Sequence, residues 1–257
     1  MRILLTNDDG IHAPGLEVLE EIAAQLSSDV WVVAPDDEQS GASHSLTISE
    51  PLRMRRISER RFAVRGTPTD CVLLAVQHLV EGKPPDLLLS GVNRGGNIAD
   101  DITYSGTVAG AMEGTILSIP SIALSQIRSN SNVASTRWGT ARAHGAEVIS
   151  FLLKQGWPGD VLINVNFPDV PAEDVAGVRL ARQGKRDQSL TRIDKRVDPR
   201  GIPYYWIGFD DAPESPVPES DLACIQADCI TVTPLHLNLT HDETFSHLSK
   251  HLGELNR

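Results

Sequence analysis

Two adjacent carboxylates near the start of the chain are the first candidates for chemistry. Asp8 and Asp9 follow the apolar run 3–5 and precede Gly10, so we expect them in a loop at the end of a buried strand. Neighbouring carboxylates repel each other, and a hard divalent cation would relieve that repulsion. The alternative is a solvated acidic turn, the common state of an isolated Asp-Asp pair. Ligands from other loops would favour the metal site.

Hydroxyl and amide side chains occur in three further segments that we expect at strand ends or helix starts. They are Ser40 and Ser43 after the apolar run 30–34, Asn93 and Asn97 after the run 86–90, and Ser105, Gly106 and Thr107 before a small-residue helix. Because the carboxyl ends of parallel strands lie along one edge of a doubly wound sheet, these segments can converge on the two aspartates. An all-oxygen ligand set suits Mg²⁺ or Mn²⁺ better than zinc. Such a cation would stay partly hydrated and could accept a phosphate oxygen and an activated water.

The turn at residues 105–107 is a candidate anion site. It offers hydroxyls, free backbone amides and the positive end of a helix. It is not a Walker A loop, because no GK[ST] ending is present. Simpler interpretations remain open, namely Asn93 as a turn residue and Ser105 or Thr107 as a helix cap.

Strands and helices alternate through the first two-thirds of the chain, which predicts how these loops are positioned. Apolar runs predict strands at residues 3–5, 30–34, 86–90, 119–125 and 161–166. Helical spacing predicts helices near residues 16–26, 71–80, 108–114 and 136–153, and a β excursion is expected within 46–64. The pattern is typical of an α/β fold, a Rossmann-like doubly wound and mostly parallel sheet with right-handed crossovers.

The pattern changes after about residue 170. We expect β segments at 178–183 and 204–209 separated by a charged loop, a loop or mobile linker at 210–221, and a last strand at 230–235. A closing helix is expected at 240–255, capped by Thr240 with Glu243 at the third position. The prediction is therefore an α/β catalytic core over 1–170 and a β-rich extension with a C-terminal helix over 171–257.

Composition narrows the class of protein. A chain of 257 residues with 40% hydrophobic content suits one large domain, and a net charge of −11 argues against binding duplex nucleic acid through a basic surface. Three cysteines make neither a disulfide framework nor a zinc site, and no apolar run is long enough to span a bilayer. Because the chain enters its first strand at once, we expect no signal peptide and a cytoplasmic location without membrane contact.

Five ordered motifs carry a resemblance to a known family. They are Asn7-Asp8-Asp9-Gly10, Ala34-Pro35 followed by Ser40-Gly41, Gly66-Thr67-Pro68-Thr69-Asp70, the run from Ser90 to Asn97, and Tyr104-Ser105-Gly106-Thr107. Together they resemble the SurE survival-protein family of metal-dependent 5′/3′-nucleotidases. The resemblance runs over residues 1–126 and resumes at 204–208 and 230–236.

The resemblance implies a site and a substrate class. One divalent cation, Mg²⁺ or Mn²⁺, would be held at the family's motif positions, which here are Asp8, Asp9, Ser40 and Asn93. The phosphate contacts would fall on Asn97, Ser105, Gly106 and Thr107, and Ser43 is a further candidate from the Ser40 loop. Family members release phosphate from nucleoside monophosphates, and some shorten polyphosphate. They assemble as dimers or tetramers that exchange C-terminal β segments, so the 171–257 extension and its helix would form the oligomer interface. The family name also points to stress survival.

Our hypothesis is a single-step phosphomonoester hydrolysis by a metal-activated water. Asp8 or Asp9 would accept the proton of that water, and we leave open which. His12, His44 and His236 are more readily explained as surface or packing residues than as a general acid. The aromatic run 204–206 could stack on a nucleobase or pack in a core or subunit contact, and the basic segments 53–61 and 182–200 are favoured as solvated loops.

Two other classes of function remain open. One is a phosphotransferase that forms an aspartyl-phosphate in an acidic pocket at the strand ends. The other is a non-enzymatic Mg²⁺-nucleotide sensor or assembly protein, which would bind without turnover.

Overall fold

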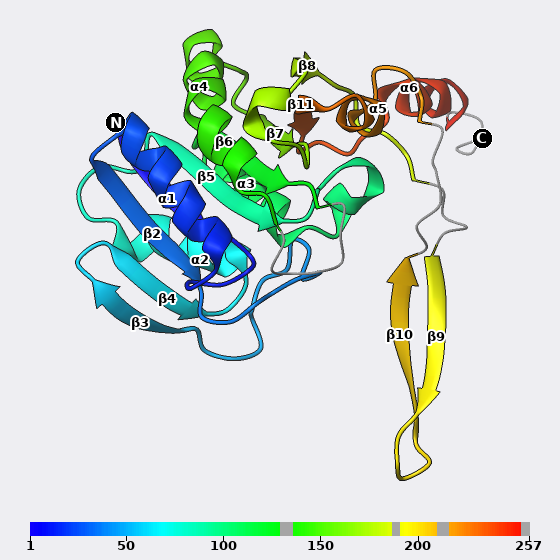
Figure 1. The fold of residues 1–257 in the computed structure, drawn as a ribbon, viewed down its shortest axis with the longest axis horizontal. Helices are drawn as coiled ribbons and strands as arrows, with labels where there is room; N and C mark the ends of the chain where they lie inside the picture. Colours follow the sequence, from blue (N-terminus) through cyan, green and yellow to red (C-terminus); the bar gives the residue numbers. More distant parts are fainter. Residues whose placement is uncertain (129–135, 187–190, 210–215, 253–257) are drawn as a thin grey trace.

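A central sheet organises the chain, whose computed structural model describes residues 1–128, 136–186, 191–209 and 216–252 (Figure 1). In the described part the sheet has nine strands in the order β3-β4-β2-β1-β5-β6-β7-β11-β8. Their bounds are β1 Arg2–Thr6, β2 Asp29–Pro35, β3 Arg53–Ser58, β4 Arg61–Arg65, β5 Leu87–Arg94, β6 Ser121–Gln126, β7 Val161–Phe167, β8 Gly177–Leu180 and β11 Cys229–His236. The sheet confirms the expected α/β class.

The sheet is mostly parallel and reverses its direction of growth beside β1. Strands β4, β2, β1, β5, β6 and β7 are parallel neighbours, whereas β3 runs antiparallel to β4 and β11 antiparallel to β7. The chain builds outward from β1 through β2 and later returns to place β5 on the other side of β1. The carboxyl ends of β1 and β5 therefore flank a topological switch point, where open α/β sheets form a ligand crevice.

Helices cover both faces of the sheet, as a doubly wound fold requires. Helices α1 (Pro14–Leu26) and α4 (Gly139–Gln155) pack on one face, and α2 (Pro68–Leu74), its π-helical continuation Ala75–Leu79 and α3 (Gly106–Ile116) pack on the other. Alternating side chains of β1 serve the two cores: Ile3 and Leu5 join the first and Leu4 the second. This double burial explains why the strand reads as a continuous apolar run.

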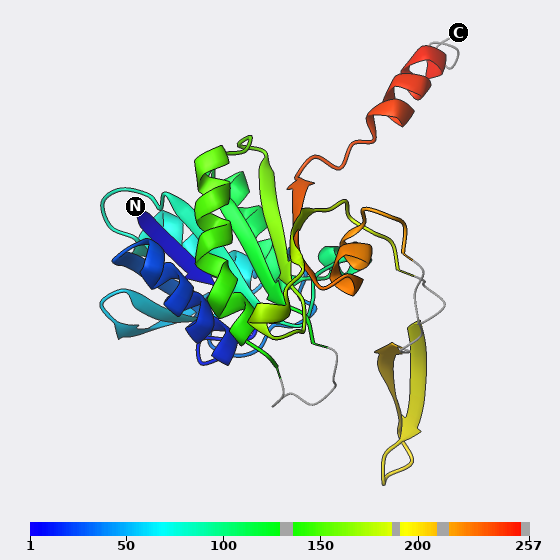
Figure 2. The same cartoon turned by 45° about the horizontal axis from the view of Figure 1, so that its top comes forward.

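Some elements after residue 170 extend the central sheet, and others project away from it. Strands β8 and β11 extend the sheet beyond β7. Strands β9 (Thr191–Val197) and β10 (Pro203–Phe209) form a separate antiparallel hairpin that projects from the body, and α6 (Asp242–His251) also projects, as Figures 1 and 2 show. Within the described range, the expected charged loop before residue 200 is therefore wrong. The reason is that β9 exposes charged and apolar side chains alike, and no buried face marks it in the sequence.

Two smaller expectations also need correction. Strand β5 was expected to end at Ser90, but after a bulge Asn93 pairs with Ser125 of β6 and the strand continues to Arg94. Helix α6 is capped by His241, whose Nδ1 accepts a hydrogen bond from the Thr244 backbone amide, and not by Thr240. Part of the expected 210–221 linker, residues 210–215, lies outside the described residues.

The end of that linker is ordered in the fold. Ser220 caps α5 (Asp221–Gln226), and the Asp221 side chain is fully buried. The acidic and proline-rich composition predicted a solvated segment, but three backbone amides satisfy this carboxylate in the interior.

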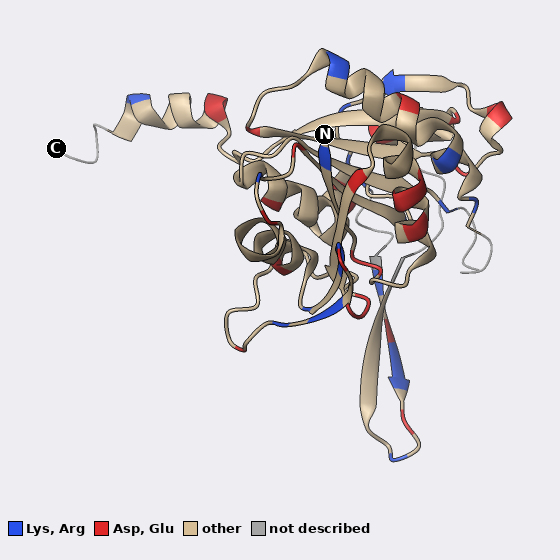
Figure 3. Cartoon of the chain, turned by 90° about the vertical axis from the view of Figure 1, so that its left-hand side faces the viewer, with Lys and Arg blue, Asp and Glu red and all other residues tan. Residues whose placement is uncertain are grey.

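Surface charge is mixed. Acidic and basic positions are interspersed on the side of the chain shown in Figure 3. Along the edge strand β3 and its turn the arginines form ion pairs, Arg55 with Asp36 at 2.6 Å and Arg60 with Asp29 at 3.0 Å. The segment 53–61 is mostly exposed, as expected, but residues 53–58 form an edge strand and not the expected loop. Charges on an edge strand also discourage strand addition. All three cysteines are free thiols, and no helix among the described residues has the length and apolar character needed to cross a membrane.

Candidate functional site

Asp8 is the buried centre of the candidate site. It lies just beyond the carboxyl end of β1, and its Oδ1 accepts a 2.5 Å hydrogen bond from the Thr107 hydroxyl at the start of α3. Gly106 permits this approach, because a Cβ on it would stand 2.8 Å from the Asp8 Cβ. Burial raises the pKa of Asp8 to about 6, with a smaller contribution from the neighbouring Asp9, even though the Thr107 hydrogen bond acts in the opposite direction.

Asp9 faces the end of β5. Its Oδ2 accepts a hydrogen bond from the Arg94 backbone amide at 3.1 Å, and the Arg94 guanidinium lies 3.9 Å from its Oδ1. Burial raises the pKa of Asp9 as well, and the Arg94 amide and charge offset only part of that effect. Strands β1 and β5 thus bring their terminal polar groups together, as the switch point predicts.

Asn93 and Ser40 lie on the two segments that meet the aspartates. Asn93 directly precedes the amide bound to Asp9, and its Nδ2 donates to the Gly95 carbonyl at 2.9 Å, which fixes the orientation of the side-chain amide. Ser40 donates to Glu38 at 2.7 Å. The Ser40 loop is held to the site because the Gln39 amide donates to the Asp8 carbonyl at 2.7 Å.

Asn97 is held by the neighbouring strands. Its backbone amide donates to Asn166 Oδ1 at 2.9 Å, and its carbonyl accepts from the Nδ2 atoms of Asn164 and Asn166. Its own Nδ2 donates to the Ser125 hydroxyl at 2.9 Å. The side chain is 6% exposed. Hydrogen bonds to β6 and β7 therefore fix the position of Asn97 at the rim of the site, the edge formed by the carboxyl ends of the parallel strands.

Ser43 and Ser105 both make hydrogen bonds at the turn that leads into α3. The Ser105 hydroxyl accepts from the Val108 amide at 3.0 Å and so caps the helix, which was the simpler interpretation of this residue. Ser43 donates from its hydroxyl to the Thr103 carbonyl at 2.8 Å and from its amide to the Tyr104 carbonyl at 3.3 Å. Thr107 is not the cap, since its hydroxyl binds Asp8.

The donor set fits a hard divalent cation. Asp8 and Asp9 are consecutive carboxylates whose burial opposes ionisation, and a bound cation would stabilise both charges. Among the described residues there is no group of three or more His, Cys, Asp and Glu side chains suited to a metal ion. A cation bound here would rely on two carboxylates and neutral oxygens and would keep water ligands, which suits Mg²⁺ or Mn²⁺ rather than zinc.

A pocket of about 300 Å³ opens beside Asp9. Its lining combines acidic, basic and aromatic side chains: Asp9, His12, Asp36, Asp37, Glu38, Arg94 and Trp138, with Gly10, Ala13, Pro14 and Gly15. This volume is at the lower end for small-molecule sites.

The other residues considered from sequence lie in different places. His44 contacts Glu113 of α3 at 3.0 Å, whereas His236 pairs with Val161 at the amino end of β7 and so lies at the opposite edge of the sheet. Tyr204, Tyr205 and Trp206 are exposed on the projecting hairpin, so the core-packing interpretation is wrong for them.

Sequence reasoning missed the residues that support the rim. Glu38 links Ser40 to Arg94, with the Arg94 guanidinium 3.7 Å from the Glu38 carboxylate. Asn164 and Asn166 hold Asn97. A signal for the asparagines was present, because two amides alternate within an otherwise apolar buried strand and a buried amide needs hydrogen-bond partners.

Comparisons with known proteins identify relatives of the chain in sequence and in fold. The family model described as survival protein SurE matches residues 3–190. The chain is 56% identical over 255 residues to a 5′-nucleotidase SurE of Parvibaculum lavamentivorans, with 99% of this chain and 92% of the relative covered. It is 56% identical over 254 residues to a 5′-nucleotidase SurE of Caulobacter vibrioides, with 98% and 97% covered. A crystal structure of the Sure protein from Aquifex aeolicus superposes with a TM-score of 0.82 at 40% identity, covering 97% of this chain and 99% of that one.

Proposed function

Because this chain belongs to the SurE family, we propose that it is a nucleotidase that hydrolyses nucleoside 5′- and 3′-monophosphates with the help of one divalent cation. The observation that supports this most is the pair Asp8 and Asp9 at the switch point of the sheet, with Asp8 buried against the start of α3 and Asp9 facing the end of β5. Short-chain polyphosphate is a further proposed substrate, since it presents the same terminal phosphoryl group.

The cation, Mg²⁺ or Mn²⁺, would be held by Asp8, Asp9, Ser40 and Asn93. When bound, a cation of this kind polarises phosphoryl oxygens and lowers the pKa of a bound water. Arg94 supports the arrangement from the side, because its amide and guanidinium both face Asp9.

The chain's own groups on the α3 side would bind and orient the phosphoryl group. We assign this role to Asn97, Ser105, Gly106 and Thr107, with Ser43 beside them. The amides at the start of α3 and the nearby hydroxyls would stabilise the developing negative charge. Asp8 or Asp9 would take the proton of the attacking water. The hydrogen bond from the Thr107 hydroxyl orients Asp8 both as a metal ligand and as a proton acceptor.

A phosphate-release assay with Mn²⁺ or Mg²⁺ tests the proposal across 5′- and 3′-nucleotides and polyphosphate. We expect turnover by the wild type and its loss in Asp9→Asn. Asp160→Asn is the matched control, because Asp160 is an exposed carboxylate next to the amino end of β7, at the other edge of the sheet. Full activity of Asp9→Asn would remove Asp9 from the proposed site.

The phosphate-release assay and a trapping experiment separate the alternatives. An aspartyl-phosphate phosphotransferase would accumulate a phosphoryl enzyme that is stable in acid and cleaved by hydroxylamine. A sensor or assembly protein would bind nucleotide with Mg²⁺ and release no phosphate.

We also propose that the chain forms a homodimer or homotetramer through its C-terminal extension. Apolar side chains stand exposed on the hairpin and on α6, among them Tyr205, Trp206, Ile207, Phe245 and Leu248. Such projecting apolar surfaces are typical of segments that pack against a second copy. Sedimentation of the full chain beside a Trp206→Ser, Phe245→Ser variant tests this, and an unchanged mass would contradict it. The cytoplasm remains the proposed location, without membrane or duplex nucleic acid as partners.

A further inference from the structure

The loop between β5 and α3 carries the proposed phosphate contacts at both of its ends. Asn97 stands at the start and Ser105 at the end, and the short 3-10 helix η2 (Ala99–Thr103) lies between them. Asn97 is pinned by β6 and β7 and Ser105 by α3. The conformation of the intervening turn therefore determines the relative positions of Asn97 and Ser105.

Ala99 is the unusual residue in this turn. Its φ of 52° lies in the left-handed region that residues with a Cβ avoid, and the residue is fully buried. Both of its backbone polar groups are bound by the C-terminal part of the chain. Its amide donates to Asp221 Oδ2 at 2.8 Å, and its carbonyl accepts from Gln183 Nε2 at 3.0 Å. Contacts from far along the sequence thus hold a backbone conformation that local preference disfavours.

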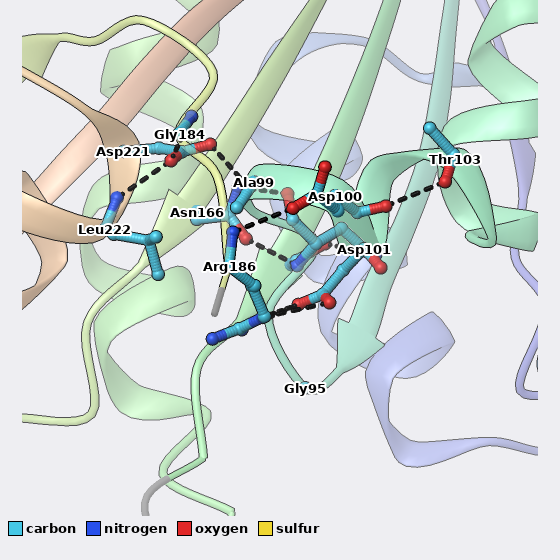
Figure 4. A network of polar contacts seen from close by, with 12 residues as sticks. Gly95, Ala99, Asp100, Asp101, Thr103, Asn166, Gly184, Arg186, Asp221 and Leu222 are labelled. Carbon is cyan, nitrogen blue, oxygen red and sulfur yellow. Dashed lines mark hydrogen bonds and ion pairs between the residues drawn. The ribbon is translucent and has the colours of Figure 1, made fainter. Parts of the chain in front are cut away.

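Asp221 is the hub of these contacts, as Figure 4 shows. Besides Ala99, its carboxylate accepts from the amides of Gly184 at 2.9 Å and Leu222 at 2.8 Å. A Cβ at Gly184 would stand 2.7 Å from Asp221 Oδ1, so a glycine is needed for this approach. One buried side chain therefore joins η2, the segment after β8 and the start of α5.

Arg186 makes a second connection between the same segments. Its backbone amide donates to Asp100 Oδ2 at 2.7 Å. Its guanidinium binds the Asp101 carboxylate through two nitrogens, Nε at 3.0 and 2.9 Å from the two oxygens and Nη2 at 2.6 Å from Oδ2. Such a two-nitrogen contact restrains orientation as well as distance. Figure 4 shows Arg186 and Asp221 approaching η2 from the C-terminal segment.

We propose that Asp221 and Arg186 are positioning residues that hold the β5–α3 loop in the conformation that binds the phosphoryl group. This inference rests on the proposed function of the site and adds residues that touch neither phosphate nor metal. The two aspartates of the metal side follow β1 directly, and no hydrogen bond or ion pair among the described residues joins them to Asp221 or Arg186, so we expect the metal side to depend less on this support.

The test measures phosphate and metal affinity separately on the full chain. In Arg186→Ala we expect the inhibition constant of inorganic phosphate to rise about tenfold and kcat to fall, since a misplacement of about 1 Å can cost up to roughly 100-fold. The dissociation constant of Mn²⁺ alone should stay within about twofold, because the two aspartates are held by Thr107 and Arg94 and not by Arg186 or Asp101. Asp101→Asn should reproduce the effect, and the double variant should add little to it.

Arg142→Ala is the matched control. Arg142 forms an ion pair of similar length with Glu21, 2.6 Å, on the α1–α4 side of the molecule and away from the loop. It should behave as the wild type. Asp221→Asn should act in the same direction as Arg186→Ala with a larger effect, because it places an amide donor against backbone donors. If that variant fails to fold, the partly exposed Arg186 and Asp101 pair still decides the question.

Two results would overturn the proposal. One is an unchanged phosphate inhibition constant in both Arg186→Ala and Asp101→Asn. The other is an equal loss of phosphate and Mn²⁺ affinity, which would indicate general loosening. Should the wild type release no phosphate from any nucleotide, the proposed function fails separately. Hydrogen exchange then decides the positioning role, which requires faster exchange over 97–105 in Arg186→Ala than in Arg142→Ala and is refuted by equal exchange.

Discussion

The two sides of the proposed site are held in different ways. Asp8 and Asp9 are the second and third residues after β1, and the strand itself delivers them to the rim. The β5–α3 loop instead depends on remote partners, since Asn97 is held by a residue 69 positions away and Ala99 by one 122 positions away. The comparison teaches that β1 and its turn place the two aspartates locally, although their hydrogen-bond partners, Thr107 and Arg94, are themselves 99 and 85 positions away. The phosphate side depends on the packing of β7, the segment after β8 and α5, which supply the partners of Asn97 and Ala99.

The largest expected effect comes from removing the charge at the centre of the metal side. In Asp8→Asn we expect phosphate release to fall on the order of 10³-fold, because a proposed metal ligand and anionic group is lost. Metal-free protein should nevertheless become more stable at neutral pH, since burial opposes the Asp8 charge. Assays and urea unfolding of the same preparations measure both. A variant that is inactive and also less stable at pH 7 would contradict this account.

The contact between Asp8 on the metal side and the start of α3 on the phosphate side is close enough for one added methyl group to disturb it. Gly106→Ala would place a Cβ 2.8 Å from the Asp8 Cβ, so one of the two must move. We expect a loss of activity of up to roughly 100-fold, the cost of a displacement of about 1 Å. Gly139→Ala is the matched control, because Gly139 also begins a helix and no atom would lie within 4 Å of its Cβ. That variant should keep its activity, and a similar loss in both would refute the steric argument.

The pH dependence of stability should report the buried carboxylate of the metal side. The folded-state pKa of Asp8 is raised from 3.8 to about 6, so its favourable contribution is present below pH 4 and is lost as pH rises through 6. The loss should be roughly 3 kcal/mol in metal-free protein. Urea unfolding of the wild type and Asp8→Asn between pH 4 and pH 7 measures it. A difference between them that does not vary with pH would show that Asp8 does not titrate in this way.

The smallest expected effect concerns the hydrogen bond by which Asn166 holds Asn97 on the phosphate side. Asn166→Ala leaves the buried Asn97 amide without its acceptor, which should cost about 1–3 kcal/mol of stability. Thr231→Val on the neighbouring strand is the control, because the Thr231 hydroxyl has no hydrogen-bond partner among the described residues. It should be neutral or slightly stabilising. Thermal unfolding compares the two, and equal losses would show that the hydrogen bond to Asn97 is not the cause.

Prediction from sequence succeeded where a residue's surroundings are local. The apolar runs located β1, β2, β6 and β7. It failed at β9, a strand whose faces are both exposed, and at α6, where a histidine takes the place of the expected cap. Local composition also predicted wrongly at Asp221. An acidic residue in a proline-rich stretch is expected to be exposed to solvent, whereas three backbone amides bind this one in the interior.

The sequence by itself determined the α/β class, the strand ends that carry the aspartates, and the family. These follow from hydrophobic periodicity and from motifs of adjacent residues, both of which are written in short stretches of chain. Only the tertiary structure decided that Thr107 holds Asp8, that Asn166 holds Asn97, and that Asp221 holds Ala99 in a left-handed conformation. Each of these is a hydrogen bond between residues far apart in the chain. Periodicity does not encode such partners, because they are set by the packing of strands and helices that bring them within 3 Å.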